Sequence, residues 1–290
     1  MRRLFVILIA FTTLHVAADY SRDQEMTVAE LNGIKIAYTE TGAADAPPVL
    51  LIMGLTGSHR LWGEDFVNGL VSNGYRVVLF DNRDTGKSSR LDELGTPTLW
   101  WELLKSYIGL DVDAPYSLRD MAADAIAVLD ELDIEQAHIV GASMGGMIAQ
   151  ILAAEYPDRT TSLVSIMSTT GAPHLPEPSD EAQGQLEGIG SGDGDVAELH
   201  DFGIHPEAMP RQLMAIIAAG DRSEQVATIS VPTLVQHGID DPLLPPPHGA
   251  HTAELISGSR YVVYPGMAHD MPAEVVPAII KDIVGHFTSL

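Results

Sequence analysis

A serine on a glycine-flanked turn is the side chain of this sequence best placed to act as a nucleophile. Residues 141–145 read Gly-Ala-Ser-Met-Gly, and they connect an apolar, strand-like run to a helix-like stretch. G-x-S-x-G in this strand–turn–helix context predicts a tight, strained bend that exposes the hydroxyl of Ser143 at the carboxyl end of a sheet. There the hydroxyl could attack a carbonyl carbon. The backbone N–H of Met144, at the start of the helix, could donate to the resulting oxyanion.

Such a serine needs a histidine as base and a carboxylate that orients the histidine. In enzymes with this motif the acid and the histidine follow the serine in chain order, each on a loop after a strand. Asp241 follows the apolar run 233–237, and His269 follows the apolar run 261–264, so both occupy the required places. We therefore predict a catalytic triad of Ser143, Asp241 and His269.

Asp240 is the alternative to Asp241 as the orienting acid, because the two carboxylates are adjacent. Pro242 directly after Asp241, and Gly238 three residues before it, match the turn that usually carries this acid. Asp241 is therefore preferred, and the sequence leaves open whether Asp240 contributes.

The loop after the strand at 49–53 is expected to supply the second oxyanion donor. We predict that the backbone N–H of Leu55 is this donor and that Gly54 lets the loop approach the serine closely. Gly57 in the same loop and Met267 in the loop after the last strand are expected, together with Gly54, to contact the substrate.

Two further patterns suggest other chemistry and are better explained as structural. His248 and His251 lie one helical turn apart, but no third histidine or carboxylate cluster accompanies them, so no metal site is predicted. Residues 84–88 resemble the end of a phosphate-binding loop, but that pattern requires glycine where this chain has Asp81. We expect a tight turn here, in which Asp81 or Arg83 braces the active-site loops.

The composition of the chain excludes several kinds of reactive group and several classes of binding partner. The chain has 290 residues, 46% of them hydrophobic, which suffices for one large or two small domains with a sizeable core. It contains no Cys, which excludes disulfides, thiolate nucleophiles and Cys-ligated zinc. Its formal net charge of −24 argues against nucleic acid and anionic membranes as partners, because both would repel it. No cofactor is predicted, and the oligomeric state is left open.

Alternating strand and helix patterns predict an α/β domain with a mostly parallel sheet. Asn32 and Gly33, between two short runs, suit a type I′ hairpin turn. The expected strands are 28–31, 34–39, 49–53, 76–80, 138–141, 163–167, 233–237 and 261–264. The clearest helices, with apolar residues at three- and four-residue spacing, are 118–132, 144–156 and 273–287. The core is predicted to comprise residues 19–170 and 229–290.

The segment 171–228 interrupts this alternation. It is rich in Gly, Pro, Asp and Glu, contains no convincing strand, and has its clearest helical stretch near 210–219. Because its length far exceeds that of an ordinary loop, we predict a cap over the site. The alternative is a long solvent-exposed loop.

The N-terminus has the pattern of a targeting segment. Two arginines precede the apolar run 4–14, and the small residues 16–18 follow. This predicts a signal peptide, residues 1–18, cleaved after Ala18 to give a secreted or periplasmic protein that is no longer attached to the membrane. The alternative is an uncleaved anchor, although the apolar run is shorter than the ~20 residues that a membrane span needs.

With these features the sequence resembles the α/β-hydrolase fold superfamily from about Ala29 to the C-terminus, apart from the cap. Met-Gly at 53–54 in place of the frequent His-Gly, together with the segments 81–88, 246–249 and 265–269, resembles the aclacinomycin methylesterase group. The resemblance implies an eight-stranded sheet, a cap over the site, and ester hydrolysis through a Ser-His-Asp triad without a cofactor. It also implies that Ser143 is the nucleophile, His269 the base and Asp241 the acid. The cap is shorter and poorer in aromatic residues than in that group, so a polyketide-like substrate is not implied.

The predicted function is a serine carboxylic-ester hydrolase that acts on small to medium esters. Lactonases, C–C bond hydrolases and perhydrolases use the same triad and are alternatives within enzymes. A ligand-binding receptor with vestigial hydrolysis is an alternative of another class, because one fold can serve either use. Epoxide hydrolases and haloalkane dehalogenases are disfavoured, because their nucleophile is an aspartate where this chain has Ser143.

Overall fold

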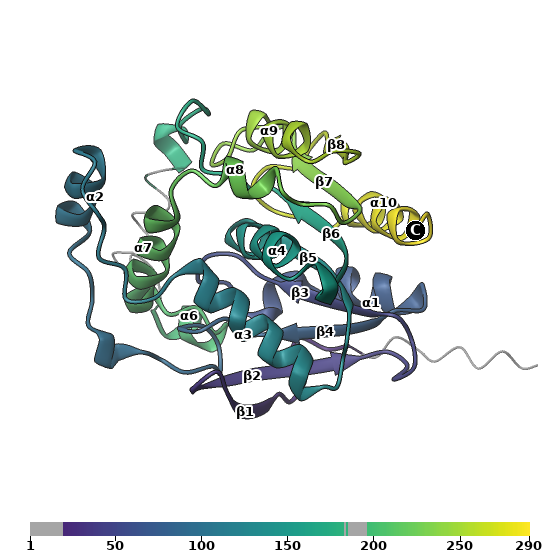
Figure 1. Cartoon of the computed structure of the whole chain (residues 1–290). Helices are drawn as coiled ribbons and strands as arrows, with labels where there is room; N and C mark the ends of the chain where they lie inside the picture. Colours follow the sequence, from purple (N-terminus) through teal and green to yellow (C-terminus); the bar gives the residue numbers. More distant parts are fainter. Residues whose placement is uncertain (1–19, 183, 185–195) are drawn as a thin grey trace, which may run out of the picture.

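An eight-stranded sheet forms the centre of the structure, a computed structural model that describes residues 20–182, 184 and 196–290. The strands lie in the order β1-β2-β4-β3-β5-β6-β7-β8 (Figure 1). β1 with β2 and β2 with β4 pair antiparallel, and the other neighbours pair parallel, which confirms the predicted α/β fold. The strands are β1 (Thr27–Leu31), β2 (Ile34–Thr41), β3 (Pro48–Ile52), β4 (Arg76–Phe80), β5 (Ala137–Ala142), β6 (Thr160–Ile166), β7 (Thr233–Gly238) and β8 (Arg260–Tyr264).

The hairpin between β1 and β2 turns at the two predicted residues. Asn32 and Gly33 have φ values of 51° and 79°, and positive φ at both positions is the mark of a type I′ turn. Leu31 therefore pairs with Ile34, and the register of the first two strands is fixed.

Helices cover both faces of the sheet. α3 (Leu118–Glu131) and α4 (Met144–Glu155) lie on one face, and α1 (Glu64–Ser72) and α10 (Val276–Phe287) lie on the other (Figure 1). α9 (Pro247–Leu255) packs against β7 and β8. Short 3₁₀ helices are η1 (His59–Trp62), η2 (Asp92–Leu94) and η3 (Pro157–Arg159).

The central strands are apolar throughout because both of their faces are buried. In β3, Val49 and Leu51 point into the core under α1 and α10, and Leu50 and Ile52 point into the core under α3 and α4. None of the four is accessible to solvent. A rigid, doubly covered strand of this kind holds the loop at its carboxyl end in a fixed place, which is what a catalytic site needs.

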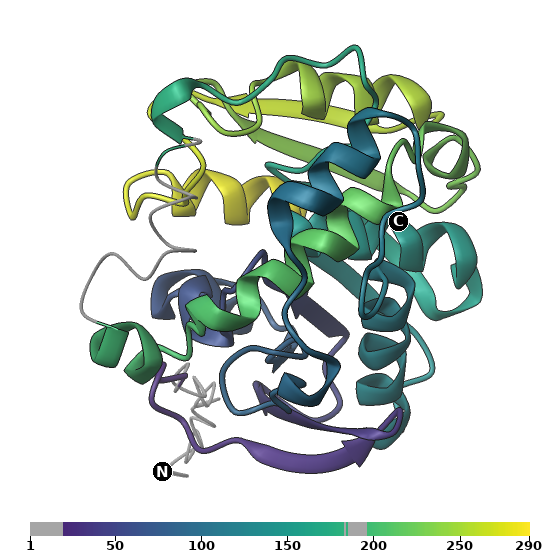
Figure 2. The same ribbon diagram turned by 90° about the vertical axis from the view of Figure 1, so that its left-hand side faces the viewer.

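The predicted cap segment 171–228 contains α6 (Val196–Asp201), η4 (Pro206–Ala208), α7 (Met209–Ala219) and α8 (Ser223–Val226). The glycine-rich run at 188–194 lies outside the described residues. α7 coincides with the helix expected near 210–219. α2 (Leu99–Tyr107), which the sequence assigns to the core segment 19–170, contacts α7 and lies beside it (Figures 1 and 2). α7, in the predicted cap segment, thus has a partner from a distant part of the chain.

α2 presents large apolar side chains to solvent. Trp100 and Trp101 are 69% and 47% exposed, and Ile108, just past the end of the helix, is exposed as well. The polar side chains Glu102 and Lys105 pair with each other at 2.8 Å. The side chains of α2 that the structure describes are thus mostly exposed, and the helix packs against α7.

The predicted signal peptide, residues 1–18, lies outside the described residues. Tyr20, the first described residue, is buried, and its backbone exchanges two hydrogen bonds with the side chain of Asn68 on α1. Within the part of the chain that the structure describes, no helix combines the length and the apolar character that crossing a bilayer requires.

Candidate active site

Ser143 occupies a strained turn between β5 and α4. Its φ of 55° and ψ of −121° are unusual for a residue with a side chain. The backbone N–H of Ser143 donates to the carbonyl of Ile166 at 3.0 Å, which ties the turn to β6. Glycine is required at position 145, because a Cβ there would lie 1.9 Å from the carbonyl oxygen of Ile52. The two glycines of the motif thus let α4 approach the sheet edge closely enough to form the bend.

The structure brings together the three residues predicted as the triad. Nε2 of His269 lies 2.9 Å from Oγ of Ser143, and Nδ1 of His269 lies 2.8 Å from Oδ2 of Asp241. Since a carboxylate only accepts hydrogen bonds, Nδ1 must carry a proton, and Nε2 is left to accept the serine proton. The loops after β5, β8 and β7 therefore bring a hydroxyl, a base and an orienting acid, in that order, into one chain of hydrogen bonds.

Asp241 is almost completely buried, but its carboxylate is held in the ionised form. Burial alone would raise its pKa; hydrogen bonds from His237 and His269, the charge of His269 and the backbone N–H of Leu244 lower it, and the net pKa lies well below the ordinary value. Oδ1 also accepts the backbone N–H of Leu243 at 2.9 Å. The acid that faces His269 is therefore a charged group over the whole neutral range.

Asp240, the alternative acid, does not contact His269. Its side chain is exposed, and its Oδ2 accepts the backbone N–H of Gly266 at 3.0 Å. The structure thus separates the adjacent carboxylates: Asp241 faces the histidine, and Asp240 closes the loop after β8.

His237 supports the acid and was missed in the sequence analysis. It is fully buried at the end of β7, and Nε2 donates to the carbonyl of Leu244 at 2.6 Å while lying 3.5 Å from Oδ2 of Asp241. The histidine–acid spacing of four residues was visible in the sequence. It indicates a contact only once the direction of the loop after β7 is known.

The loop after β3, residues 53–57, approaches Ser143 closely. A Cβ on Gly54 would lie 2.9 Å from Cβ of Ser143, so glycine is needed for this approach. Among the described residues, the backbone N–H groups of Leu55 and Met144 have no hydrogen-bond acceptor. These are the two groups that the sequence analysis assigns to the oxyanion hole, and they are free to donate to a ligand.

Two of the residues expected to contact the substrate are buried in the structure. Met267 is fully buried in the core beside α10, and its carbonyl accepts the backbone N–H of Asp240. Gly57 is also buried, and it faces the side chains of Met53 and Leu61. Both residues shape the loops from beneath. The sequence could not show this, because it does not reveal which way a loop residue points.

Asp81 and Arg83 brace the neighbouring loops as expected. Oδ1 of Asp81 accepts the backbone N–H of His59 at 2.8 Å, and Oδ2 accepts the backbone N–H of Lys87 at 2.9 Å. Arg83 forms a buried ion pair with Asp124 on α3, with Nε and Oδ2 separated by 2.7 Å. The segment that resembles a phosphate-binding loop is therefore filled by its own carboxylate.

The histidine pair on α9 is engaged by neighbouring threonines. Nδ1 of His248 lies 2.7 Å from Oγ1 of Thr169, and Nδ1 of His251 lies 2.9 Å from Oγ1 of Thr170. These bonds join α9 to the chain that follows β6, which is a structural role for both histidines.

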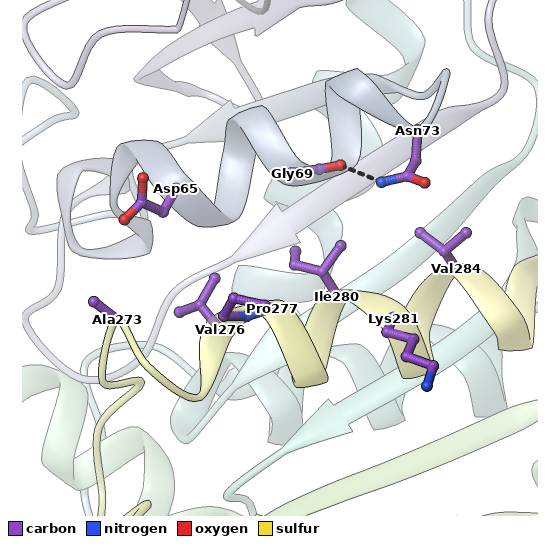
Figure 3. Close-up of a pocket in the computed structure, with 9 residues that line it drawn as sticks. All are labelled: Asp65, Gly69, Asn73, Ala273, Val276, Pro277, Ile280, Lys281 and Val284. Atoms are coloured by element: carbon purple, nitrogen blue, oxygen red, sulfur yellow. Dashed lines mark hydrogen bonds between the residues drawn. The ribbon is translucent and has the colours of Figure 1, made fainter.

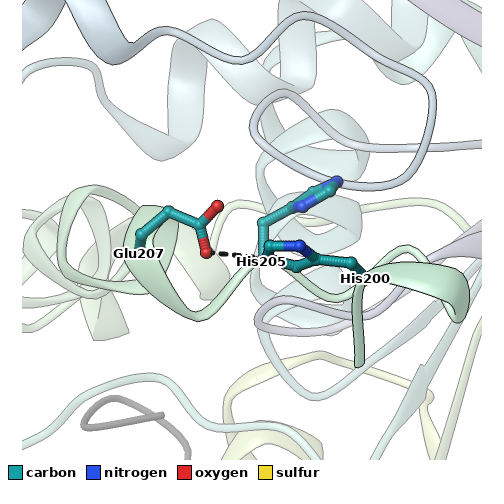
Figure 4. A group of neighbouring side chains, drawn as sticks. All are labelled: His200, His205 and Glu207. Atoms are coloured by element: carbon teal, nitrogen blue, oxygen red, sulfur yellow. Dashed lines mark hydrogen bonds and ion pairs between the residues drawn. The ribbon is translucent and has the colours of Figure 1, made fainter. Parts of the chain in front are cut away.

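One other group in the described part of the chain has side chains of the metal-binding type. Ligand atoms of His200, His205 and Glu207 lie within 4.8 Å of one another (Figure 4). However, Nη2 of Arg90 lies 2.8 Å from Glu207, and Nη1 of Arg90 lies 3.2 Å from Nδ1 of His205. A metal ion would have to displace this guanidinium. The group is better explained as one of the contacts that attach the segment 171–228 to the loop that carries Arg90.

A groove of about 660 Å³ runs between α1 and α10 (Figure 3). Ile280 and Val284 on α10 form its apolar wall, and Asp65 and Lys281 lie at its rim. No residue of the triad lines this groove, so it is separate from the candidate active site.

Comparisons with known proteins agree with the fold described above. The model of the α/β hydrolase fold family matches residues 47–197. The rhodomycin D methylesterases DauP of a Streptomyces species and DnrP of Streptomyces peucetius are 30% and 29% identical to this chain. Each alignment covers 84% of this chain and 91% of the relative.

Solved structures share the same fold at lower identity. The enol-lactonase of Burkholderia xenovorans has a TM-score of 0.69 at 22% identity, covering 90% of this chain and 100% of the other. A thermophilic esterase of Thermogutta terrifontis has a TM-score of 0.66 at 21% identity, covering 91% and 99%. Together with the family match, these similarities lead to one conclusion: the chain belongs to the α/β-hydrolase fold family.

Proposed function

We propose that this protein is a serine carboxylic-ester hydrolase that acts on small to medium esters through an acyl-enzyme. The observation that carries the proposal is the unbroken hydrogen-bond chain from Ser143 through His269 to Asp241, with distances of 2.9 and 2.8 Å. The two methylesterase relatives, similar over most of both chains, support an ester as the substrate class.

Acylation begins when Nε2 of His269 takes the proton of the Ser143 hydroxyl as Oγ attacks the ester carbonyl carbon. The imidazolium that forms is stabilised by the ionised Asp241. The carbonyl oxygen becomes an oxyanion, which accepts hydrogen bonds from the backbone N–H groups of Leu55 and Met144. His269 then gives its proton to the alcohol oxygen, and the C–O bond breaks.

Deacylation repeats these steps with water as the nucleophile. His269 removes a proton from the water, the same two N–H groups stabilise the second oxyanion, and Ser143 leaves as the protonated hydroxyl. The strained φ of Ser143 keeps Oγ at the sheet edge throughout, so little reorganisation is needed between the two halves of the reaction.

Hydrolysis of a series of p-nitrophenyl esters, from acetate to decanoate, tests the proposal. Wild-type protein should turn over short and medium esters, and Ser143→Ala should lower kcat by several orders of magnitude. Ser223→Ala, which removes a hydroxyl from a half-buried serine on α8, is the matched control and should keep wild-type activity. Equal activity of wild type and Ser143→Ala would exclude Ser143 as the nucleophile.

We also propose that the protein is exported and that residues 1–18 are removed. Tyr20 lies just beyond the predicted cleavage position and is anchored on α1, which fits a folded domain that begins there. The intact mass of the exported protein should correspond to a chain that starts at Asp19. A membrane-bound chain that keeps Met1 would contradict this.

A further inference from the structure

We propose that Gln212, on the cap helix α7, is a positioning residue that holds the oxyanion loop (residues 53–57) in its catalytic conformation. The inference rests on the proposed function and adds to it a residue outside the triad and the oxyanion hole. Gln212 is fully buried, although it belongs to a segment that follows the nucleophile by almost seventy residues. The cap would then help to build the site as well as cover it.

The amide group of Gln212 is fixed by three hydrogen bonds. Its Oε1 accepts the backbone N–H of Thr56 at 2.7 Å. Its Nε2 donates to the carbonyl of Arg83 at 2.8 Å and to Oγ1 of Thr85 at 2.9 Å. Exchanging the oxygen and the nitrogen would set donor against donor and acceptor against acceptor, so the chemistry of the partners determines the orientation.

Thr56 is the point at which this contact acts on the loop. The turn is closed by a hydrogen bond from the backbone N–H of Gly57 to the carbonyl of Gly54 at 3.1 Å. Thr56, the third residue of the turn, has a φ of 58°. The third position of a type II turn normally needs glycine, because φ there is positive. A β-branched residue such as threonine with positive φ is a genuine outlier. Something outside the turn must stabilise it.

Gln212 supplies that stabilisation. In the alternative type I turn φ at this position is negative, and the peptide between Leu55 and Thr56 is rotated so that its N–H points the other way. The Thr56 N–H would then lose its acceptor while buried, which is unfavourable. The hydrogen bond to Gln212 therefore selects the observed turn. The Leu55 N–H belongs to the preceding peptide, and φ of Leu55 is near −60° in both turn types. Gln212 therefore acts on the proposed oxyanion donor by holding the whole turn in place, one peptide away from that N–H.

The neighbouring residue on α7 keeps Gln212 in place. Arg211 is fully buried, and its Nε and Nη2 donate to both carboxylate oxygens of Asp84 at 2.8 and 2.7 Å. Asp84 also accepts the hydroxyl of Tyr116 at 2.7 Å. This bidentate contact fixes α7 relative to the loop after β4. Gln212 consequently bonds to the oxyanion loop from a rigid support.

The central experiment compares the kinetics of Gln212→Met and wild type on p-nitrophenyl acetate. Methionine has a similar size but removes all three hydrogen bonds. Loss of one oxyanion donor lowers kcat by about 10²–10³-fold, and a misplaced donor should cost about 10- to 100-fold. We expect this loss in kcat, with KM changed by less than about threefold, because the contact matters most when the oxyanion forms. The affinity of phenylboronic acid, whose tetrahedral adduct resembles that oxyanion, should fall by the same factor.

Three further variants separate positioning from general support of the cap. Gln212→Glu keeps an acceptor for Thr56 and should lose less kcat than Gln212→Met. Thr85→Val removes one bond of the same amide but leaves the Thr56 contact, and it should also lose less. Thr56→Gly combined with Gln212→Met should recover part of the lost kcat, because glycine adopts positive φ without strain.

The outcomes are distinct. A folded Gln212→Met protein with wild-type kcat and wild-type boronic acid affinity would overturn the inference, as would Thr85→Val losing as much kcat as Gln212→Met. If Gln212→Met does not fold, Gln212→Glu and the double variant decide the question by their kcat values. Ser143→Ala is measured in the same assay. Its inactivity preserves the proposed function whatever Gln212 does, whereas wild-type activity in Ser143→Ala would refute that function and this inference with it.

Discussion

Replacement of Asp241 by asparagine should remove nearly all catalysis, because the structure forces the new amide into the orientation that gives the wrong imidazole tautomer. Oδ1 of Asp241 accepts the backbone N–H groups of Leu243 and Leu244, both at 2.9 Å, and Oδ2 faces Nδ1 of His269 at 2.8 Å. Asparagine has the same shape, but one of its two terminal groups is NH₂, which only donates. Two backbone donors can be satisfied only by the amide oxygen, so the NH₂ group must face His269.

An NH₂ group in that position donates to Nδ1 of His269 and leaves the ring proton on Nε2. Nε2 then cannot accept the proton of Ser143, and the base is lost together with the charge that stabilises the imidazolium. We expect kcat to fall about 10⁴-fold, which corresponds to about 5 kcal/mol of activation free energy.

The assay is p-nitrophenyl acetate hydrolysis by Asp241→Asn at pH 8, with nitrogen-15 NMR of the histidine side chains to locate the ring proton. Asp240→Asn is the matched control, because its exposed side chain bonds only to the loop after β8, and it should stay within about threefold of wild type. The reasoning is refuted if Asp241→Asn keeps more than about 1% of wild-type kcat, or if its His269 still carries the proton on Nδ1.

Three further predictions concern stability. Burial, with a smaller effect of His286, lowers the pKa of His138 from 6.5 to about 4. The contribution of the neutral imidazole to the free energy of unfolding is therefore fully present above pH 6.5 and is lost as the pH falls toward 4. In urea unfolding, His138 should lower the free energy of unfolding by about 2.5 kcal/mol at pH 4.5 relative to pH 7. His138→Gln should remove this difference, and a variant with the same pH dependence as wild type would contradict the prediction. Arg211→Met leaves the buried carboxylate of Asp84 without its positively charged partner and should reduce the free energy of unfolding by about 3–5 kcal/mol. Most of this loss should be recovered when Asp84→Asn is added, and full stability of the single variant would show that the pair is dispensable. Gly145→Ala should prevent folding or abolish activity, because the added Cβ would lie 1.9 Å from the carbonyl oxygen of Ile52. Gly285→Ala on α10 is the control: its Cβ would have no atom within 4 Å, so the melting temperature should be unchanged or higher.

Much of the sheet and of the candidate site was predictable because both depend on local patterns. A buried parallel strand such as β3 is apolar on both faces, so its position is visible in the sequence. The nucleophile turn is equally local, since its glycines and serine are contiguous. The chain order of acid and histidine then led to Asp241 and His269, and the structure brings both to Ser143.

The features that were missed depend on contacts between distant segments. The contact of α2 with α7, and the bonds from Gln212 to the oxyanion loop, join parts of the chain more than one hundred positions apart. The role of His237 and the burial of Met267 were not foreseen for a related reason: side-chain direction on a loop is set by the packing around it. Met267 points into the core, and His237 points at the acid.

The position of the indole rings gives this protein a built-in optical probe. The chain has three tryptophans, and two of them, Trp100 and Trp101, stand exposed on α2, while Trp62 is buried against Phe66. Emission from the exposed pair should be red-shifted and readily quenched by acrylamide, and emission from Trp62 should be blue-shifted and shielded. The fluorescence of the native protein therefore reports mainly on the surroundings of α2. A movement of α2 relative to α7 could be followed in real time without attaching a dye.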